Sequence, residues 1–246
     1  MNNLQETLLF PVRDAEASKQ FLIACAIMLA SFFIPLLPMF VIMGYSIKIM
    51  RQIIDERKVP SMPSWREIDW AETFMDGLKL FAVQLVLLLP LFFFLGIGIF
   101  LLLGGSISLG ALSNESTNSQ APIAGVLFAI GIAFTILFSL LSLPYGVIMT
   151  AAVPHVATKR SFASGFEFQE WWAIFRKGIG QFILAYALYF LLSIAFGLIM
   201  QIAIITIVLI CIVPLLTIPY AVYLMLIGNA LYAQAYVAGR DALQAG

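Results

Sequence analysis

The sequence predicts an all-α fold, a polytopic transmembrane helical bundle. Two observations predict this fold class. The chain is 62% hydrophobic and only 11% charged, whereas a soluble domain carries roughly 25% charged residues. Asp, Glu, Lys and Arg are also absent from four long stretches, which cover residues 20–47, 80–114, 116–158 and 178–239. Because a membrane-spanning helix needs about 20 mostly apolar residues, these stretches can hold several spans.

The apolar segments divide into three helix pairs within a single membrane domain, 1–246. Each pair has an opening segment, with the pattern Ala17-x-x-x-Phe21, Gly77-x-x-x-Phe81 or Gly178-x-x-x-Phe182. Each opening is followed by a segment that contains a proline, at Pro38, Pro144 or Pro219. We therefore expect an internal repeat, which is common in membrane folds. The expected bounds are 17–50, 77–156 and 178–240 for the pairs, 51–76 and 157–177 for the interfacial loops, and 104–121 for the outer loop of the second pair.

The first pair is too short for two full spans. Phe21–Ile34 and Leu37–Met50 would each reach about 21 Å at 1.5 Å per residue, less than the ~30 Å hydrocarbon core. Pro35-Leu-Leu-Pro38 favours a break between them. We favour a short hairpin that enters and leaves from one side, giving four full spans plus the hairpin. The alternative is one tilted, kinked helix and five spans.

The distribution of charge predicts the topology. In the hairpin arrangement all thirteen Lys and Arg residues lie on one face of the membrane, and Glu115 is the single formal charge on the other. The positive-inside rule makes the basic face cytoplasmic, so we expect a multi-pass protein of the cell (plasma) membrane with a cytoplasmic N-terminus and cytoplasmic basic loops. The single-helix alternative moves Arg13 and Lys19 to the outer face.

All four tryptophans lie in the two interfacial loops, as Trp65, Trp70, Trp171 and Trp172. Tryptophan favours the headgroup level of a membrane, so both loops are expected to lie along its surface as amphipathic segments. These side chains could dock a protein partner at the cytoplasmic face, or they could only anchor the loops in lipid. Asp69, with Glu72 three residues later, has the pattern of a helix start.

No ionisable residue lies deep in the expected spans, which argues against a proton-coupled pump. The candidate residues for lining a polar cavity are Gln201, Asn229, Tyr220 and Tyr223. Their other interpretation is structural, because polar side chains also hydrogen-bond one helix to another.

A stripe of small residues, Gly125-x-x-x-Ala129-x-x-x-Ala133, has helical spacing. Such a stripe allows two helices to approach closely. We expect this contact within the chain rather than across a dimer.

No catalytic, cofactor-binding or metal-binding residue is predicted. His155 is the only histidine and cannot make a His-rich metal site, and no Cys or acidic cluster stands at ligand spacing around it. The glycine-rich pieces lack the context of a phosphate loop, and no basic face carries the interleaved aromatics that nucleic acid requires. The expected partners are membrane lipid and a protein, without nucleic acid, and the sequence does not indicate an oligomeric state.

Several motifs in the first 90 residues resemble a family of prokaryotic membrane proteins known only as domain of unknown function 4013. The motifs are Leu9-Phe10-Pro11 with Arg13-Asp14, Ile42-Met43-Gly44-Tyr45-Ser46-Ile47-Lys48-Ile49-Met50-Arg51, the Pro60/Pro63 linker that leads to Trp70, and Phe74-Met75-Asp76-Gly77-Leu78-Lys79. The doubled proline of the linker departs from the family pattern. The resemblance implies a membrane protein and brings no assigned activity.

Two functions therefore stand as hypotheses. The first is a non-enzymatic membrane scaffold or accessory subunit, which the missing intramembrane charges and the aromatic loops favour. The alternative is a passive transporter or channel, or a lipid-handling protein, which the apparent repeat, the proline-bearing helices and the polar residues of the third pair favour.

Overall fold

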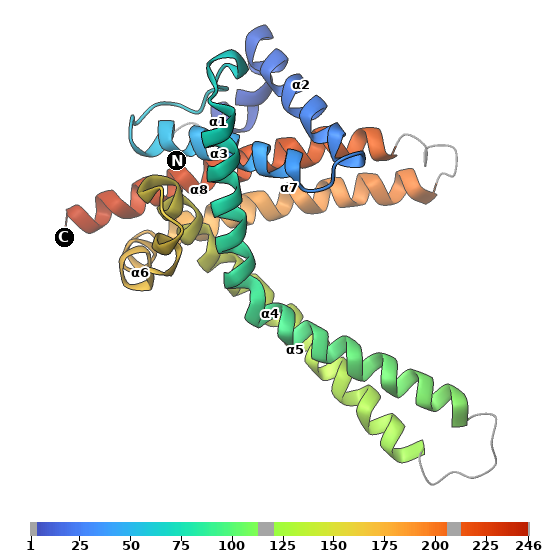
Figure 1. The fold of residues 1–246 in the computed structure, drawn as a ribbon. Helices are drawn as coiled ribbons and strands as arrows, with labels where there is room; N and C mark the ends of the chain where they lie inside the picture. The colour runs from blue at the N-terminus through green and yellow to red at the C-terminus, as the bar shows by residue number, and fades with distance from the viewer. Residues whose placement is uncertain (1–3, 113–120, 206–212, 246) are drawn as a thin grey trace. The chain divides into compact units, whose positions relative to one another are not determined.

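A computed structural model describes residues 4–112, 121–205 and 213–245. These residues form helices and loops without a strand (Figure 1), which confirms the predicted all-α fold class. Within the described residues, six helices are long and apolar enough to cross a membrane. The α-helices are α1 (Leu4–Leu9), α2 (Ala15–Leu29), α3 (Leu37–Ile54), α4 (Trp70–Leu112), α5 (Ala121–Lys159), α6 (Phe168–Lys177), α7 (Ile179–Ile205) and α8 (Val213–Gln244), and the 3-10 helices are η1 (Phe10–Val12), η2 (Ala30–Phe32), η3 (Trp65–Glu67) and η4 (Ala163–Phe166).

The chain divides into two compact units. The larger unit contains residues 1–83 and 147–246, and the smaller unit contains residues 84–146. Helices α4 and α5 contribute to both units, because each boundary falls within one of them. Helix α4 begins as predicted: the Asp69 carboxylate accepts a hydrogen bond from the backbone N–H of Glu72 at 3.0 Å and so caps the helix.

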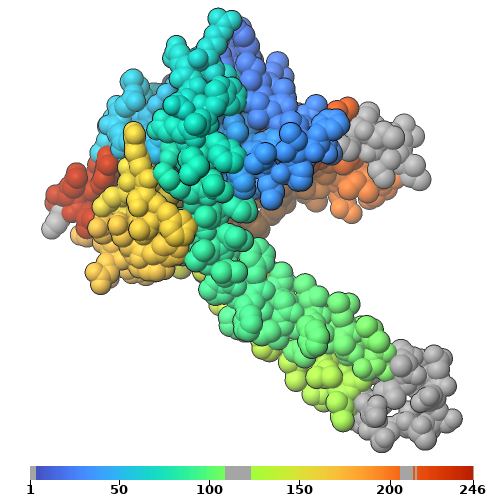
Figure 2. Space-filling model, in the orientation of Figure 1, coloured from blue at the N-terminus to red at the C-terminus, as the bar shows by residue number. Residues whose placement is uncertain are grey.

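The core of the larger unit forms around α3. Most side chains of this helix are buried, among them Tyr45, Ile49 and Met50. Helix α8 packs along α3, and α6 and α7 pack against α8. Figure 2 shows the yellow segment around α6 on the surface of this unit, beside the teal start of α4. Because α3 is enclosed by protein, its polar groups need partners from neighbouring segments.

The first helix pair folds as two helices with a break between them. Helix α2 continues through η2 to Phe32, and α3 begins at Leu37. Between them Leu36 has a φ of 73°, and the N–H of Leu37 donates to the carbonyl oxygen of Pro35 at 3.0 Å, which makes a tight and strained γ-turn. Helices α2 and α3 also pack against each other. The structure thus has the break that the prolines predict, and it has no single long helix here.

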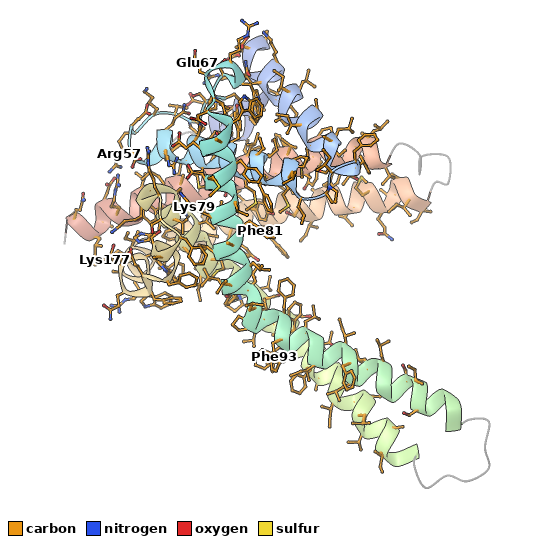
Figure 3. The ribbon with its side chains drawn as sticks, viewed as in Figure 1. Arg57, Glu67, Lys79, Phe81, Phe93 and Lys177 are labelled. Carbon is orange, nitrogen blue, oxygen red and sulfur yellow. The ribbon has the colours of Figure 1, made fainter. Side chains whose placement is uncertain are left out.

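The smaller unit consists of residues 84–112 of α4 and 121–146 of α5, which pack closely at glycines. A Cβ atom added to Gly105 would lie 2.7 Å from the backbone nitrogen of Phe128, and one added to Gly131 would lie 2.6 Å from that of Leu102. Large apolar side chains face outward instead, and Phe93, which is 68% exposed, points away from the helices in Figure 3. An apolar surface of this kind suits a lipid environment.

Two expectations for this region are wrong. The outer loop does not begin at residue 104, because α4 continues as a helix to Leu112; the rest of that loop, with Glu115, lies outside the described residues. Within the smaller unit, the small-residue stripe does not form the predicted contact with a neighbouring helix of the described residues either. Ala129 and Ala133 are exposed, and a Cβ added to Gly125 would meet nothing within 4 Å.

Candidate functional site

Helices α3 and α4 cross with their backbones in contact. A Cβ added to Gly44 would lie 1.7 Å from the carbonyl oxygen of Thr73, and one added to Gly77 would lie 1.8 Å from that of Phe40. Glycine is therefore required at both positions, since any side chain would overlap the opposing backbone. The crossing brings the end of α3 beside the start of α4.

A buried ion pair lies next to this crossing. Arg51 Nη1 is 2.5 Å from Asp76 Oδ2, and the two side chains are only 11% and 7% exposed. Arg51 Nε also donates to the carbonyl oxygen of Ala157 at 2.8 Å, and Lys79 Nζ lies 3.7 Å from Asp76 Oδ1. Arg51, Asp76 and Ala157, termed the Arg51 junction, thus join α3, α4 and α5. Breaking a buried pair leaves an uncompensated charge, so this junction fixes how the three helices meet.

A second polar cluster lies where α5 ends and α6 begins. It contains His155, Lys159, Glu167, Glu170 and Tyr236, and it is termed the His155 cluster. His155 is 1% exposed; its Nδ1 lies 2.8 Å from the Tyr236 hydroxyl, and its Nε2 lies 3.1 Å from Glu167 Oε2 and 3.7 Å from Glu170 Oε2. Lys159 Nζ is 2.8 Å from Glu170 Oε2, and the hydrogen bond from this ammonium lowers the pKa of Glu170 below its ordinary value.

The sequence has no acidic cluster at metal-ligand spacing, but the fold brings two glutamates to His155. The chain turns back after α5 through η4, and Glu167, just before α6, and Glu170, in the first turn of α6, then lie beside the imidazole. One imidazole nitrogen and two carboxylates are a donor set that can hold a divalent cation.

The four candidate cavity residues do not meet in one site. Asn229 Nδ2 donates to Ser46 Oγ at 2.9 Å, and the Tyr223 hydroxyl donates to the carbonyl oxygen of Leu8 at 3.0 Å. The Tyr220 hydroxyl donates to the carbonyl oxygen of Leu192 at 2.6 Å, and Gln201 is exposed near the end of α7. Three of the four side chains thus connect α8 to three different segments, which fits the structural interpretation of these residues.

The four candidate docking tryptophans fall into two classes. Trp65 is buried, and its ring N–H donates to the carbonyl oxygen of Gln20 at 2.9 Å. Trp171 is 2% exposed. Trp70 and Trp172 are accessible, at 51% and 39% exposed. The two buried rings hold the loops on the core, so only Trp70 and Trp172 can meet a partner.

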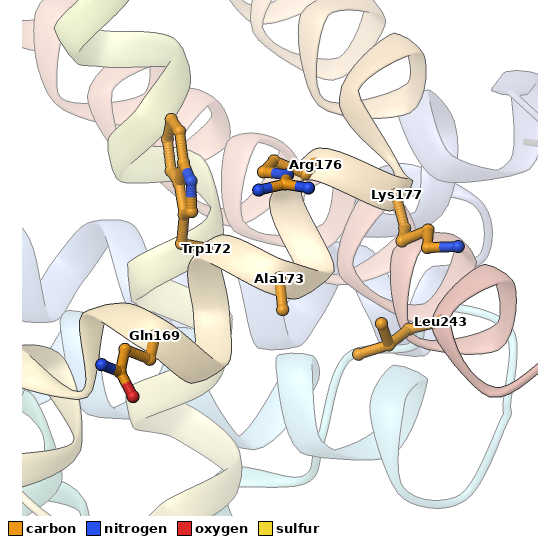
Figure 4. A pocket seen from close by; sticks show the side chains of 6 residues that line it. All are labelled: Gln169, Trp172, Ala173, Arg176, Lys177 and Leu243. Carbon is orange, nitrogen blue, oxygen red and sulfur yellow. The ribbon is translucent and has the colours of Figure 1, made fainter. Parts of the chain in front are cut away.

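A pocket lies on the accessible face of α6 (Figure 4). Its volume is about 370 Å³, and its lining residues are Gln169, Trp172, Ala173, Arg176, Lys177 and Leu243. The opposite face of α6 packs Trp171, Ile174 and Phe175 into the larger unit. No carboxylate of the described residues lies within ion-pair distance of Arg176 or Lys177. The pocket therefore combines two cationic side chains with an indole ring and an apolar side chain.

The family model described as "Protein of unknown function (DUF4013)" matches residues 27–205. The chain belongs to this family. The match covers most of the chain, including the Arg51 junction and four members of the His155 cluster, and it confirms the resemblance seen in the sequence. No curated protein and no solved structure matches the chain.

Neither cluster was predicted from the sequence, although some signals were present. Gly44 and Arg51 stand in one of the motifs that resemble DUF4013, and Asp76 and Gly77 stand in another; the structure shows that these two motifs form the two sides of the α3–α4 crossing. Glu167 and Glu170 are three residues apart at a helix start, and such spacing places two side chains on one face. Their position beside His155 depends on the path of the chain through η4, which has no local signal.

Proposed function

We propose that this DUF4013 protein is a non-enzymatic membrane scaffold or accessory subunit. The main support for the proposal is that the side chains of Asn229, Tyr220 and Tyr223 all donate hydrogen bonds to other segments of the protein. A path for a polar substrate or ion needs polar groups that face the path. Here those groups join α8 to α3, α7 and α1 instead, which supports a fixed framework over a transport path.

We further propose that the charged end of the larger unit faces the cytoplasm of a cell whose plasma membrane holds the protein. Contacts between the basic segments support this topology. Arg57 Nη2 pairs with Asp241 Oδ1 at 2.6 Å, Arg240 Nη2 donates to the carbonyl oxygen of Ile54 at 2.8 Å, and Gln234 Nε2 donates to Thr7 Oγ1 at 2.7 Å. These contacts bring α1, the linker after α3 and the end of α8 together, which supports a single cytoplasmic face under the positive-inside rule.

The pocket on α6 is the proposed docking place for an acidic segment of a partner protein. Arg176 and Lys177 supply charge complementary to carboxylates, and Trp172 with Leu243 supplies an apolar contact. Tryptophan and arginine are enriched among the residues that carry binding energy in protein interfaces. The positive charge of Arg176 and Lys177 would also steer an acidic partner towards the pocket, which favours association.

Co-purification tests this proposal. The protein is extracted gently from its native membrane, and the proteins that remain bound are quantified against it. We expect a partner at a fixed ratio, and we expect Trp172→Ala with Arg176→Gln to release it, because both side chains line the pocket. Trp70→Ala is the matched control, since it removes an accessible tryptophan from the other loop. A chain that purifies alone under these conditions contradicts the proposal.

Lipid handling is the second candidate, because the same pocket also suits an anionic phospholipid. Cations beside an interfacial tryptophan match a phosphate headgroup at the membrane surface. Native mass spectrometry in nanodiscs that contain phosphatidylglycerol separates the two functions. Retention of that lipid, lost in the double variant, together with the absence of a protein partner, favours lipid handling over the scaffold.

A further inference from the structure

We infer that the His155 cluster is a binding site for a divalent transition-metal ion, with His155 Nε2, Glu167 Oε2 and Glu170 Oε2 as its ligands. This inference is independent of the proposed partner, because it concerns the junction between α5 and α6 and not the pocket. It rests on three features of the cluster: its geometry, its neighbours and the cation that it already holds.

The geometry suits a tetrahedral ion with three protein ligands and an open fourth position for water. All three ligand atoms lie within 4.8 Å of one another, and the two distances from His155 Nε2 are 3.1 Å to Glu167 and 3.7 Å to Glu170. Ligand atoms around a tetrahedral Zn²⁺ at 2.0–2.2 Å lie about 3.4 Å apart. An ion can therefore enter between them with small movements of the two glutamate side chains, both of which are partly exposed.

The neighbours of His155 orient its imidazole for this role. The ring is buried, and its second nitrogen, Nδ1, lies 2.8 Å from the Tyr236 hydroxyl. Histidine ligands in metal sites are held in this way, by a hydrogen bond from the ring nitrogen that does not touch the metal. In the tautomer whose Nδ1–H donates to the Tyr236 hydroxyl, Nε2 carries the lone pair, and this nitrogen lies 3.1 Å from Glu167 Oε2 and 3.7 Å from Glu170 Oε2. An imidazole ligand favours a transition metal over Mg²⁺ or Ca²⁺, which prefer oxygen.

The side chain of Lys159 already places a positive charge beside the two carboxylates of the cluster. Lys159 Nζ lies 2.8 Å from Glu170 Oε2 and 3.7 Å from Glu167 Oε2, so its ammonium compensates the same two carboxylates that would hold the ion. A bound metal ion displaces this ammonium, and Lys159 acts as a competitor. Removing the lysine charge should therefore strengthen metal binding, whereas removing a ligand should weaken it.

Metal binding would fasten the end of α5 to the start of α6. His155 lies on α5, Glu170 lies on α6, and Glu167 immediately precedes α6. The ion would thus hold in place the helix that carries the pocket with Arg176. The alternative is that His155 has only a structural role, through its hydrogen bonds to Tyr236 and Glu167. In that case Lys159→Met would lose an ion pair and would gain no affinity for metal.

The test uses the single histidine of the chain. The full-length protein, purified without a polyhistidine tag and labelled with ¹⁵N-histidine, is titrated with Zn²⁺ and followed by the ring nitrogen resonances of His155. We expect the Nε2 resonance to move to a metal-bound position at about one equivalent, with no response to Mg²⁺. Binding measured by calorimetry should weaken roughly tenfold or more in Glu170→Gln and His155→Gln, and should strengthen in Lys159→Met.

Lys58→Met is the matched control, since Lys58 pairs with Glu56 at 2.6 Å on the surface and lies outside the cluster. It should leave the affinity for Zn²⁺ unchanged. Circular dichroism establishes that each variant is folded. The inference would be overturned if the His155 ring resonances did not shift on addition of Zn²⁺. It would also be overturned if the wild type, Glu170→Gln and His155→Gln bound Zn²⁺ with equal affinity. A Lys159→Met variant whose affinity for Zn²⁺ does not rise would likewise overturn it.

Discussion

Gly44→Ala should destabilise the larger unit strongly, because it forces α3 and α4 apart. The new Cβ would lie 1.7 Å from the Thr73 carbonyl oxygen, whereas atoms in ordinary contact are roughly 3.5 Å apart. The obstacle is backbone, so the helices themselves must move by about 1.5 Å or more. Overpacking of this kind costs about 1–3 kcal/mol. The same movement strains the 2.5 Å contact of Arg51 with Asp76, and losing a buried pair costs about 3–5 kcal/mol. We expect a total loss of about 3–5 kcal/mol, since the pair is strained rather than removed.

The assay is unfolding by SDS in mixed micelles, followed by tryptophan fluorescence. Gly96→Ala is the control, because a Cβ at Gly96 meets nothing within 4 Å and alanine is the better helix former by about 1 kcal/mol; this variant should be as stable as the wild type or slightly more so. Gly77→Ala should behave like Gly44→Ala, since it meets the Phe40 backbone at 1.8 Å. A Gly44→Ala protein within about 1 kcal/mol of the wild type would refute the close crossing.

Four further predictions concern stability. Arg51→Met should cost about 3–5 kcal/mol because it leaves Asp76 buried without its partner, and Arg51→Met with Asp76→Leu should cost clearly less; equal losses in SDS unfolding would count against a buried pair. Asp69→Ala should cost about 1 kcal/mol through loss of the helix cap, and an unchanged midpoint would deny that role. Leu36→Gly should leave stability unchanged or raise it by up to about 1 kcal/mol, because glycine relieves the positive φ; a clear loss would speak against the γ-turn. The lowered pKa of Glu170 means that its bridge to Lys159 stabilises above the ordinary pKa of the carboxyl, about 4.5, and is lost as the pH falls through the lowered value. The melting temperature of the wild type should therefore fall towards that of Glu170→Gln only in acid. If the difference between the two melting temperatures already disappeared between pH 7 and 5, the result would contradict this prediction.

Local signals predicted the fold class and several boundaries. Hydropathy and the charge-free stretches identify the long helices, because lipid leaves a backbone few alternatives to the helix. The break between α2 and α3 agrees with the prolines at 35 and 38, because proline lacks a backbone N–H and favours the end or the first turn of a helix. The Asp69 cap follows from its side chain, which competes for backbone N–H groups. Each of these features depends on neighbours in sequence.

Other features depend on packing and could not be predicted in that way. The run Gly104-Gly105-Ser106 is typical of a loop, yet α4 continues through it, because Gly105 allows the close approach of Phe128 and a helix bonds its own backbone. Trp65 is a residue type typical of interfacial anchors, but its ring is buried, and its ring N–H donates to the backbone carbonyl oxygen of Gln20.

The two clusters show the same limit. Arg51 and Asp76 are 25 positions apart and meet only because Gly44 and Gly77 let their helices touch. His155 gains its acidic partners when α6 folds back along the end of α5. The sequence supplied the residues in both cases, and the chain path that joins them came from the structure.

The most direct test of the central claim is native mass spectrometry of the complex, extracted gently from its own membrane. A scaffold or accessory subunit predicts one stoichiometric protein partner, which is lost from the Trp172→Ala, Arg176→Gln variant and kept by Trp70→Ala. A chain that carries only lipid or a small molecule, with no protein at a fixed ratio, would contradict the account.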